Sequence, residues 1–432
     1  MSYAATALIA PARSRLTRKR TLGVVIGNAF EFYDFGVYAT FAVAIGQVFF
    51  PSDNAYVSLL LSVATFGVGF FSRPLGGLLL GAYADRHGRK AAMTLTIALM
   101  ALSTGAIGLV PSYDSIGILA PVLLVLARLV QGFSAGGELG ASTVYLYEAA
   151  PAGKKGLFGS WQLASQGAAG VVVGLIGFLI SFYLPRDTVN GWGWRIPFLL
   201  GLLIIPVGIY LRRNLDETLE PNQAHHSTGA VLSEMLRNHR KELTLSIAIF
   251  AGVTIAQYFL IYLTSYAINA LKMPGSVAML ASFVVGASTL VFAVLGGWLG
   301  DRIGLRTICI APRLILALAL YPAMQLVVAA PTPWTLLSAA AVLTALQAMS
   351  AALVVLLIAR AFPKAVRTTG LSTALGVGAA VFGGTAQVVF TWLISATGSA
   401  LSPVWYVLAM NLVSLLGIVL LKRDHDDATE KS

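Results

Sequence analysis

The chain alternates long apolar stretches with short polar ones along almost its whole length. Each stretch is close to the roughly 20 residues that an α-helix needs to cross the hydrocarbon core of a bilayer. A membrane β-barrel would instead show shorter segments in which apolar and polar residues alternate. The pattern therefore predicts an all-α membrane protein with twelve transmembrane helices, at approximately 22–50, 56–82, 91–110, 119–146, 157–184, 195–211, 243–271, 276–299, 307–329, 334–359, 368–396 and 403–421.

Composition and charge agree with that class. The chain is 57% hydrophobic and 11% charged, whereas soluble domains carry about 25% charged residues. The net charge of +11 raises the question of nucleic-acid binding, but the basic residues lie in short loops and form no continuous basic face. We therefore expect no nucleic-acid partner. The lone cysteine, Cys309, cannot form an internal disulfide.

The lysine and arginine residues predict the orientation, because loops rich in them stay on the cytoplasmic side of a membrane. With both termini in the cytoplasm, the outer loops hold only three of the 29 basic residues, which are Arg186, Arg195 and Lys272. The basic cluster before the first span resembles the start of a signal peptide. Since that apolar run is too long and contains two acids, we expect an uncleaved first span and two cytoplasmic termini.

Two pairs of loops repeat half a chain length apart. The stretch "GAYADRHGRK" begins at Gly81 and "GWLGDRIGLR" begins at Gly297, each between the second and third spans of its half. The stretches "EAAPAGKKG" and "RAFPKAVRTTG" follow spans 4 and 10. We therefore expect a duplicated transporter with a substrate site between the halves, near the midplane. The predicted organisation is a six-helix bundle at 1–211, a cytoplasmic central loop at 212–242 and a second six-helix bundle at 243–432.

These loops resemble the signature loops of the major facilitator superfamily. The stretches "GNAFEFYDF", "FFSRPLGGLLLGAYADRHGRK", "RLVQGFSAGGELG" and "WGWRIPF" are similar to its metabolite:proton symporter family, and "KKGLFGSWQLASQ" looks most like the citrate and tricarballylate carriers. The resemblance covers essentially the whole chain. It implies the major facilitator fold and a place in a bacterial inner membrane.

The chain departs from the family pattern in two places. Leu305 stands where the second-half loop of the family often has Arg, so we expect a weaker gate there. The chain also stops soon after the twelfth span, whereas compatible-solute carriers of this kind often extend into a helical tail. This difference favours an organic acid over betaine or proline as the substrate.

Six charged residues lie inside predicted spans, where each costs about 2.5–3.5 kcal/mol on insertion scales unless it is paired or faces water. The helix rise of about 1.5 Å per residue places Glu31, Asp34 and Arg73 at a similar depth on spans 1 and 2. Glu31 and Asp34 are three residues apart, so they share a helix face. We expect a carboxylate pair near an arginine that takes up and releases the coupling proton. The alternative is a static ion pair between the two spans.

Glu138, in "SAGGELG", is expected to be a structural partner or a second proton site. Arg128 and Gln131 lie three apart on span 4, which the family resemblance places on the central cavity. A planar guanidinium offers two parallel donors to a carboxylate, so we expect Arg128 to bind a substrate carboxylate, with Arg73 as a second positive centre. The alternative is that Arg128 pairs with one of the buried acids.

Further polar residues are candidates for the substrate site. Glutamines lie four apart on span 5 and tyrosines lie four apart on span 7, although polar helix contacts and a place at the bilayer interface explain such residues as well. Arg313 is only seven residues into span 9 and is expected to extend to the membrane surface. The predicted substrate-binding set is Asn28, Tyr33, Arg73, Arg128, Gln131, Gln162, Gln166, Tyr258 and Tyr262.

The repeated loops are expected to form a cytoplasmic gate that holds the halves together when the carrier faces outward. A carboxylate there can accept hydrogen bonds from a helix N-terminus and from nearby arginines. The basic residues also help to set topology, which is the alternative reading for them. The predicted gate residues are Asp85, Arg86, Arg89, Asp301 and Arg302.

The function predicted is proton-coupled uptake of citrate or a related tricarboxylate. Alternatives are uptake of 2-oxoglutarate, shikimate, proline or betaine, or proton-antiport export on the same fold; buried arginines favour an anion. An enzyme is not expected, because the sequence has no phosphate-binding loop, no His-Glu-x-x-His motif and no Cys/His cluster at metal spacing. Buried titratable groups suit alternating access better than a channel. We expect a monomer in the lipid bilayer, driven by the proton gradient, without a cofactor or metal.

Overall fold

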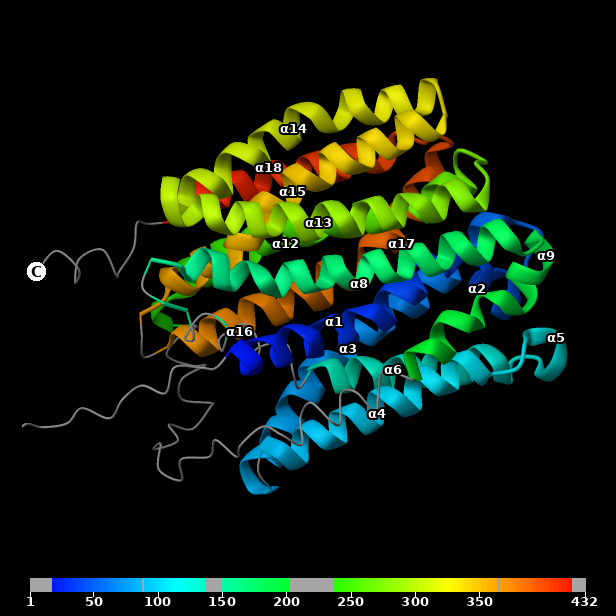
Figure 1. Ribbon diagram of the computed structural model, residues 1–432, viewed down its shortest axis with the longest axis horizontal. Helices are drawn as coiled ribbons and strands as arrows, with labels where there is room; N and C mark the ends of the chain where they lie inside the picture. The colour runs from blue at the N-terminus through cyan, green and yellow to red at the C-terminus, as the bar shows by residue number, and fades with distance from the viewer. Residues whose placement is uncertain are drawn as a thin grey trace, which may run out of the picture.

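The computed structural model describes residues 18–87, 89–136, 146, 150–151, 153–202, 237–363 and 366–421. Within these ranges the chain is helical and contains no strand (Figure 1). The helices are α1 Arg18–Thr40, α2 Ala42–Phe49, α3 Ala55–His87, α4 Arg89–Leu109, α5 Tyr113–Ile116, α6 Leu119–Gly136, α8 Lys155–Tyr183, α9 Arg186–Thr188, α12 Arg240–Asn269, α13 Gly275–Ile303, α14 Leu305–Ala329, α15 Pro333–Ala361, α16 Arg367–Gly378, α17 Gly384–Thr397 and α18 Ser402–Leu420, with π-helical turns η1 Val189–Gly193 and η2 Ala379–Gly383.

Most of the predicted spans correspond to helices that are long and apolar enough to cross a membrane. The described part of the chain holds nine such helices, or ten when the bent pair α1 and α2 is counted as one span. The third predicted span matches the shorter apolar helix Thr94–Leu109. The sixth is helical over 195–202, where the description stops. The predicted domain limit at 211, and the predicted central loop as far as residue 236, lie outside the described residues. The last residues of that loop are described, and α12 begins there at Arg240, slightly before the predicted limit at 242.

Two of the predicted spans are interrupted in the structure. The first span bends by 63° between α1 and α2. The eleventh passes through the π-helical turn η2, a feature that often marks functional sites in helices. This turn brings Gly383 against Phe70 and Tyr258, so that a Cβ at Gly383 would be 3.2 Å from both rings. The backbone of η2, in the second half, therefore packs against Phe70 of the first half and Tyr258 of the second half.

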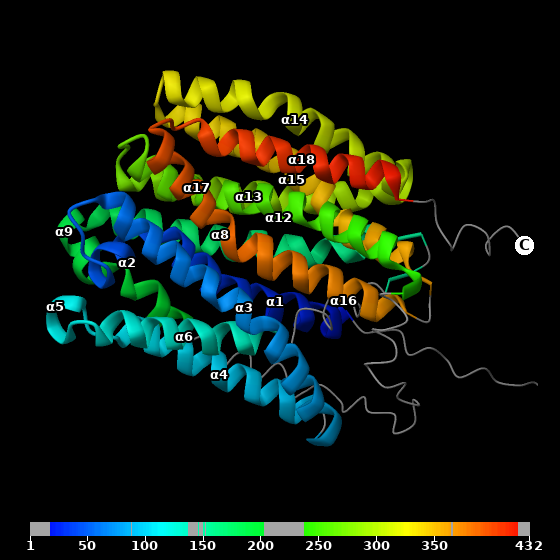
Figure 2. The ribbon, with the colours of Figure 1, turned by 180° about the vertical axis from the view of Figure 1, so that it is seen from behind.

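Close helix packing joins the two halves. α8 lies along α13, and α3 lies along α17 and η2 (Figures 1 and 2). A Cβ on Gly286 would overlap the backbone at Gly170 and Val171, and a Cβ on Gly67 would overlap the carbonyl of Gly384. Small residues permit this approach of helix backbones, which is typical of helix pairs in membranes.

Equivalent contacts in the two halves support the duplication that the loops predicted. Ser134 on α6 and Ser350 on α15 stand half a chain length apart. Ser134 Oγ donates to the carbonyl of Thr96 at 2.6 Å, and Ser350 Oγ donates to the carbonyl of Cys309 at 2.7 Å. In each half, an equivalent serine therefore connects the fourth span to the third.

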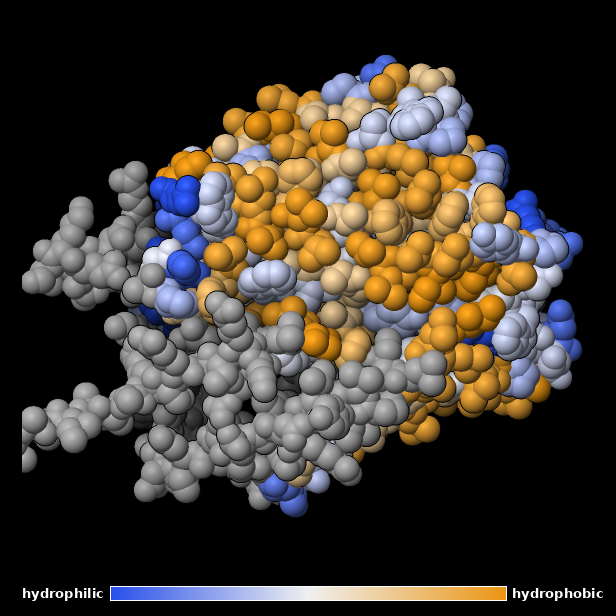
Figure 3. Space-filling view, viewed as in Figure 1, coloured by the Kyte–Doolittle hydropathy of each residue, from blue (hydrophilic) through white to orange (hydrophobic). Residues whose placement is uncertain are grey.

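The surface of the bundle is that of a membrane protein. On the face that Figure 3 shows, apolar side chains cover the middle of the bundle and hydrophilic residues gather toward its two ends. Large exposed apolar residues occur on both halves, including Leu102, Ile118, Leu318 and Leu416. Since such a wide apolar surface would be unstable in water, the belt fits the hydrocarbon core of a bilayer.

Candidate functional site

Two arginines lie buried side by side in the first half. Arg73 on α3 is 6% exposed, and Arg128 on α6 is fully buried. The two helices approach closely because glycines face backbone across the contact. A Cβ on Gly132 would overlap the carbonyl of Gly69, and a Cβ on Gly136 would overlap that of Arg73. This packing sets both guanidinium groups at the inner face of the bundle.

Aromatic rings surround the two guanidinium groups. The Cζ atom of Arg73 is 4.1 Å from the ring centre of Phe70 and 4.5 Å from that of Phe35. Cζ of Arg128 is 4.5 Å from the ring centre of Tyr38 and 4.9 Å from that of Phe66. Such contacts attract a cation to the ring face. They offset part of the cost of burying positive charge, and they use none of the N–H donors.

The arginine pair retains unused hydrogen-bond donors. Nε and Nη2 of Arg73 and Nε of Arg128 are buried and have no hydrogen-bond partner among the described residues. The other groups of Arg128 donate to Gln131 Oε1 and, at 3.2 Å, to the carbonyl of Phe66. A buried donor without a partner is costly. The pair can therefore accept an anion with a large gain in hydrogen bonding.

Each buried acid on α1 faces a different arginine. Glu31 interacts electrostatically with Arg73 and with Tyr258, whereas Asp34 interacts with Arg128 and accepts a hydrogen bond from Thr104. The prediction of one carboxylate pair beside one arginine is therefore wrong in this detail. A three-residue step turns a helix by about 300°, and that offset is enough to direct the two side chains toward different neighbouring helices.

A hydrogen-bonded chain of side chains connects Arg128 to Asp34. Arg128 donates to Oε1 of Gln131, Nε2 of Gln131 donates to Oγ1 of Thr104 at 3.3 Å, and Thr104 donates to Oδ2 of Asp34. All four residues are at most 6% exposed. Thr104 was absent from the predicted site, because a single threonine in an apolar span carries no sequence signal.

One tyrosine of the second half reaches the arginine pair. The ring centre of Tyr258 on α12 is 5.5 Å from that of Phe70 and 6.0 Å from that of Phe66. Tyr258 also interacts electrostatically with both arginines. Tyr262, one turn further along, instead shares a hydrogen bond of 3.0 Å with Thr391 on α17. The structure therefore brings Tyr258 to the cluster and places Tyr262 inside the second half.

Two of the other predicted residues connect α1 to neighbouring helices. Asn28 Nδ2 donates to the carbonyl of Gln162 at 3.0 Å and to Ser165 Oγ at 2.6 Å. Tyr33 donates to the carbonyl of Pro197 at 2.8 Å. The side chains of Gln162 and Gln166 are half-buried on α8. The polar groups of Asn28 and Tyr33 are thus used in helix contacts, and they do not point to the arginine pair.

Arg313 is buried inside the second half. It is fully buried, Nη1 donates to Asn411 Oδ1 at 3.0 Å, and Nε donates to Ser350 Oγ at 3.2 Å. The expectation that its side chain extends to the membrane surface is therefore wrong. Partners on α18 and α15 hold Nε and Nη1 in the interior, and Nη2 is buried without a hydrogen-bond partner among the described residues.

The second-half gate loop connects the halves. Asp301, near the end of α13, accepts hydrogen bonds from the backbone N–H groups of Gly156 at 2.7 Å and Leu157 at 2.8 Å. Arg302 lies over Trp298 of its own helix, with its Cζ atom 4.1 Å from the ring centre. The side chains of Asp85, Arg86 and Arg89, and the whole of Glu138, fall outside the described residues.

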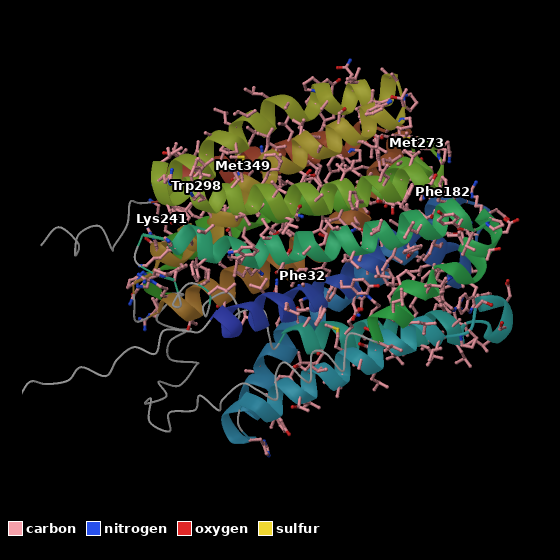
Figure 4. All side chains as sticks on the ribbon, viewed as in Figure 1. Phe32, Phe182, Lys241, Met273, Trp298 and Met349 are labelled. Carbon is pink, nitrogen blue, oxygen red and sulfur yellow. The ribbon has the colours of Figure 1, made fainter. Side chains whose placement is uncertain are left out.

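The arginine pair and this gate lie at different levels of the bundle. Trp298 and Lys241 lie toward one end, and Met273 and Phe182 lie at the other (Figure 4). Phe32, the neighbour of Glu31, lies between these ends (Figure 4).

Within the described part of the chain, no group of three or more His, Cys, Asp and Glu residues could hold a metal ion.

Comparisons with known proteins give similarities along almost the full chain. The Major Facilitator Superfamily matches residues 24–381. A citrate-proton symporter of Salmonella typhi is 37% identical over 95% of this chain and 95% of that protein. A citrate-proton symporter of Klebsiella pneumoniae is 36% identical over 93% and 91%, respectively. An alpha-ketoglutarate permease of Escherichia coli is 33% identical over 94% and 95%.

Solved structures share the fold at lower sequence identity. A D-xylose-proton symporter has a TM-score of 0.74 and 18% identity, and the match covers 94% of this chain and 98% of that one. The inward open xylose transporter XylE from E. coli has a TM-score of 0.75 and 17% identity, over 94% and 96%. At this identity, the comparison concerns the arrangement of the helices alone.

Proposed function

Because the chain belongs to the Major Facilitator Superfamily, we propose that it is a secondary active transporter that takes up citrate or a related tricarboxylate together with protons. The relatives named citrate-proton symporters resemble it over nearly the full length of both chains. No enzymatic activity is part of this proposal, and the proton gradient supplies the driving force without a cofactor.

The observation that carries the proposal is the arginine pair with unused donors. Nε and Nη2 of Arg73 are buried and lack partners within the described residues. A substrate with several carboxylates supplies acceptors and negative charge together, and an arginine binds a carboxylate through two parallel hydrogen bonds. When Glu31 and Asp34 are protonated, a neutral sugar or a cation would supply no negative charge to either arginine. We therefore assign Arg73 and Arg128 to the substrate carboxylates.

The two acids on α1 provide the proton coupling in this proposal. Glu31 interacts with Arg73 and Asp34 interacts with Arg128. An ionised acid competes with a substrate carboxylate for the same arginine. Protonation removes this competition, so a proton and an anion favour each other's binding, as symport requires.

The distribution of basic residues supports the orientation. We place the chain in a bacterial inner membrane with both termini in the cytoplasm, since loops rich in Lys and Arg stay on that side. The gate contact between Asp301 and α8 then lies at the cytoplasmic surface. The proposed transport unit is a monomer, because one chain supplies both arginines, both acids and Tyr258.

The test is uptake by purified protein in liposomes with an imposed pH gradient. The labelled substrates are citrate, tricarballylate, 2-oxoglutarate, shikimate, glycine betaine and proline. We expect citrate or tricarballylate to accumulate when the outside is acidic, and a protonophore to abolish accumulation. Accumulation of 2-oxoglutarate alone would indicate that the substrate is a smaller dicarboxylate and not a tricarboxylate. Accumulation of betaine or proline alone, or of none of the six, would contradict the proposal.

A further inference from the structure

We propose that Thr104 and Gln131 form a relay that couples protonation of Asp34 to carboxylate binding at Arg128. This inference rests on the proposed function and adds the pathway of coupling to it. Thr104 is a positioning residue in this scheme, because it acts through Asp34 and Gln131 and does not contact the substrate. The relay also separates the roles of the two acids, since Asp34 is joined to it and Glu31 lies beside Arg73.

The hydrogen bonds of the relay have a single direction. The amide of Gln131 presents its oxygen to Arg128, which has only donors, and therefore presents its nitrogen to Thr104. The hydroxyl of Thr104 accepts that bond and donates its own hydrogen to Asp34 Oδ2. The three bonds thus run from a cation to a carboxylate. Bonds aligned in this way polarise one another, and the effect is larger where water is excluded.

The surroundings of Asp34 leave little other charge to act on it. From α6 it faces Arg128, and from its own helix it faces Tyr33. From α4 it meets the neutral Thr104. From the helix at 195–202 it meets Gly201, where a Cβ would lie 3.0 Å from Oδ1. Arg128 is therefore the positive charge whose state depends most directly on Asp34.

The relay makes two states of Arg128 possible. With Asp34 ionised, the negative end of the chain favours Arg128 bound to Gln131. When Asp34 gains a proton, that negative end disappears and Arg128 becomes a buried cation with neutral hydrogen-bond partners. A substrate carboxylate then replaces Oε1 of Gln131. By reciprocity, anion binding favours the protonated form of Asp34 by the same factor.

A neighbouring residue shows what an ordinary helical hydroxyl does. Ser103, one position earlier on α4 and 1% exposed, donates to the carbonyl of Met100 in its own helix at 2.9 Å. Such a bond satisfies the hydroxyl locally and reaches no other helix. Thr104 instead connects α1 to α6. Ser103→Ala is therefore a matched control for Thr104→Val, because both variants remove one buried hydroxyl from α4.

The first experiment measures citrate affinity of purified protein as a function of pH. In the wild type we expect affinity to fall as pH rises, by about tenfold more than in Asp34→Asn, a typical size for coupling between sites. Thr104→Val and Gln131→Leu should lose most of this extra pH dependence. Thr104→Ser and Ser103→Ala should keep it. Comparison at equal pH cancels the titration of citrate itself. An unchanged pH dependence in both relay variants would overturn the inference.

The second experiment needs no substrate. Infrared spectroscopy follows the carboxyl C=O band of Asp34 through a pH titration, with Asp34→Asn identifying the band. Gln131→Leu removes no hydrogen bond to Asp34, which is bonded to Thr104, yet the relay predicts that it moves the titration of this band. Ser103→Ala should leave it in place. An unmoved band in Gln131→Leu would overturn the relay. Failure of the wild type to bind citrate would count against the substrate, and this titration would still decide the relay.

Discussion

Asp301 and Gly156 connect the two halves of the protein. Oδ1 of Asp301, near the end of α13, accepts a hydrogen bond of 2.7 Å from the backbone N–H of Gly156, near the start of α8. Oδ2 accepts a second one from Leu157 at 2.8 Å. The first N–H groups of a helix have no partners within it, and they carry the positive end of the helix dipole. The carboxylate therefore caps a helix that belongs to the other half.

Asp301→Asn should weaken this closure. Asparagine keeps one acceptor and loses the charge, so we expect a loss of about 1 kcal/mol, which is roughly fivefold in the equilibrium between closed and open forms. Spin labels at the exposed positions Lys154 and Ile303, in a Cys309→Ser background, should report longer distances, and uptake should fall. An unchanged distance distribution would mean that the contact does not hold the gate.

Glu31→Gln and Asp34→Asn should each stop accumulation of citrate against its gradient. Each removes an ionisable group that interacts with one arginine. Exchange of citrate without net proton movement should persist, because the arginines remain. The measurements are gradient-driven uptake and counterflow in liposomes. If both variants still accumulate citrate as the wild type does, the coupling acids lie elsewhere.

Arg128→Lys should weaken citrate binding by about 1–3 kcal/mol, since lysine keeps the charge but loses the planar pair of donors. Arg128→Ala should bind more weakly still. Equilibrium binding of labelled citrate at fixed pH measures both, with circular dichroism to confirm folding. Arg313→Lys is the matched control, because Arg313 is equally buried but bonds to Ser350 and Asn411. If Arg128→Lys binds citrate as tightly as the wild type, Arg128 does not bind the substrate carboxylate and is instead a structural partner of Asp34.

The two tyrosines of α12 should differ in their effect on the substrate. Tyr258→Phe removes a hydroxyl beside the arginine pair, and we expect citrate affinity to fall by about 1 kcal/mol, the typical net value of one hydrogen bond. Tyr262→Phe removes the bond to Thr391. It should lower thermal stability and leave affinity unchanged. Binding titrations and melting curves on both variants test this, and equal affinities for the two variants would contradict it.

Gly286→Ala should block the close packing of α8 against α13. Its Cβ would overlap the backbone at Gly170 and Val171, and backbone atoms cannot move aside as side chains can. We expect lower thermal stability and a large loss of transport. Gly159→Ala on α8 is the control, since a Cβ there meets nothing within 4 Å. Normal transport by Gly286→Ala would contradict this prediction, because it would mean that transport does not depend on the close packing of α8 against α13.

The sequence by itself determined the membrane class and the fold family, and it predicted the duplication and the level of the site. Apolar runs near the length of a bilayer crossing can be counted directly. The rise of a helix is nearly constant, so counting residues placed Glu31 and Arg73 at the same depth. The Asp-Arg loops similarly indicated a contact between the halves, and Asp301 makes such a contact. These features depend only on position along the chain and along a helix axis, which can be counted directly from the sequence.

Only the tertiary structure decided which side chains meet across helices. Rotation and neighbours direct Glu31 toward Arg73 and Asp34 toward Thr104, although the acids are one turn apart. Tyr258 and Tyr262 share a helix face, yet a step of about 6 Å along the axis moves one to the arginines and the other to Thr391. A hydroxyl such as that of Thr104 gains its role from three helices packed together, and no local pattern in the sequence records that packing.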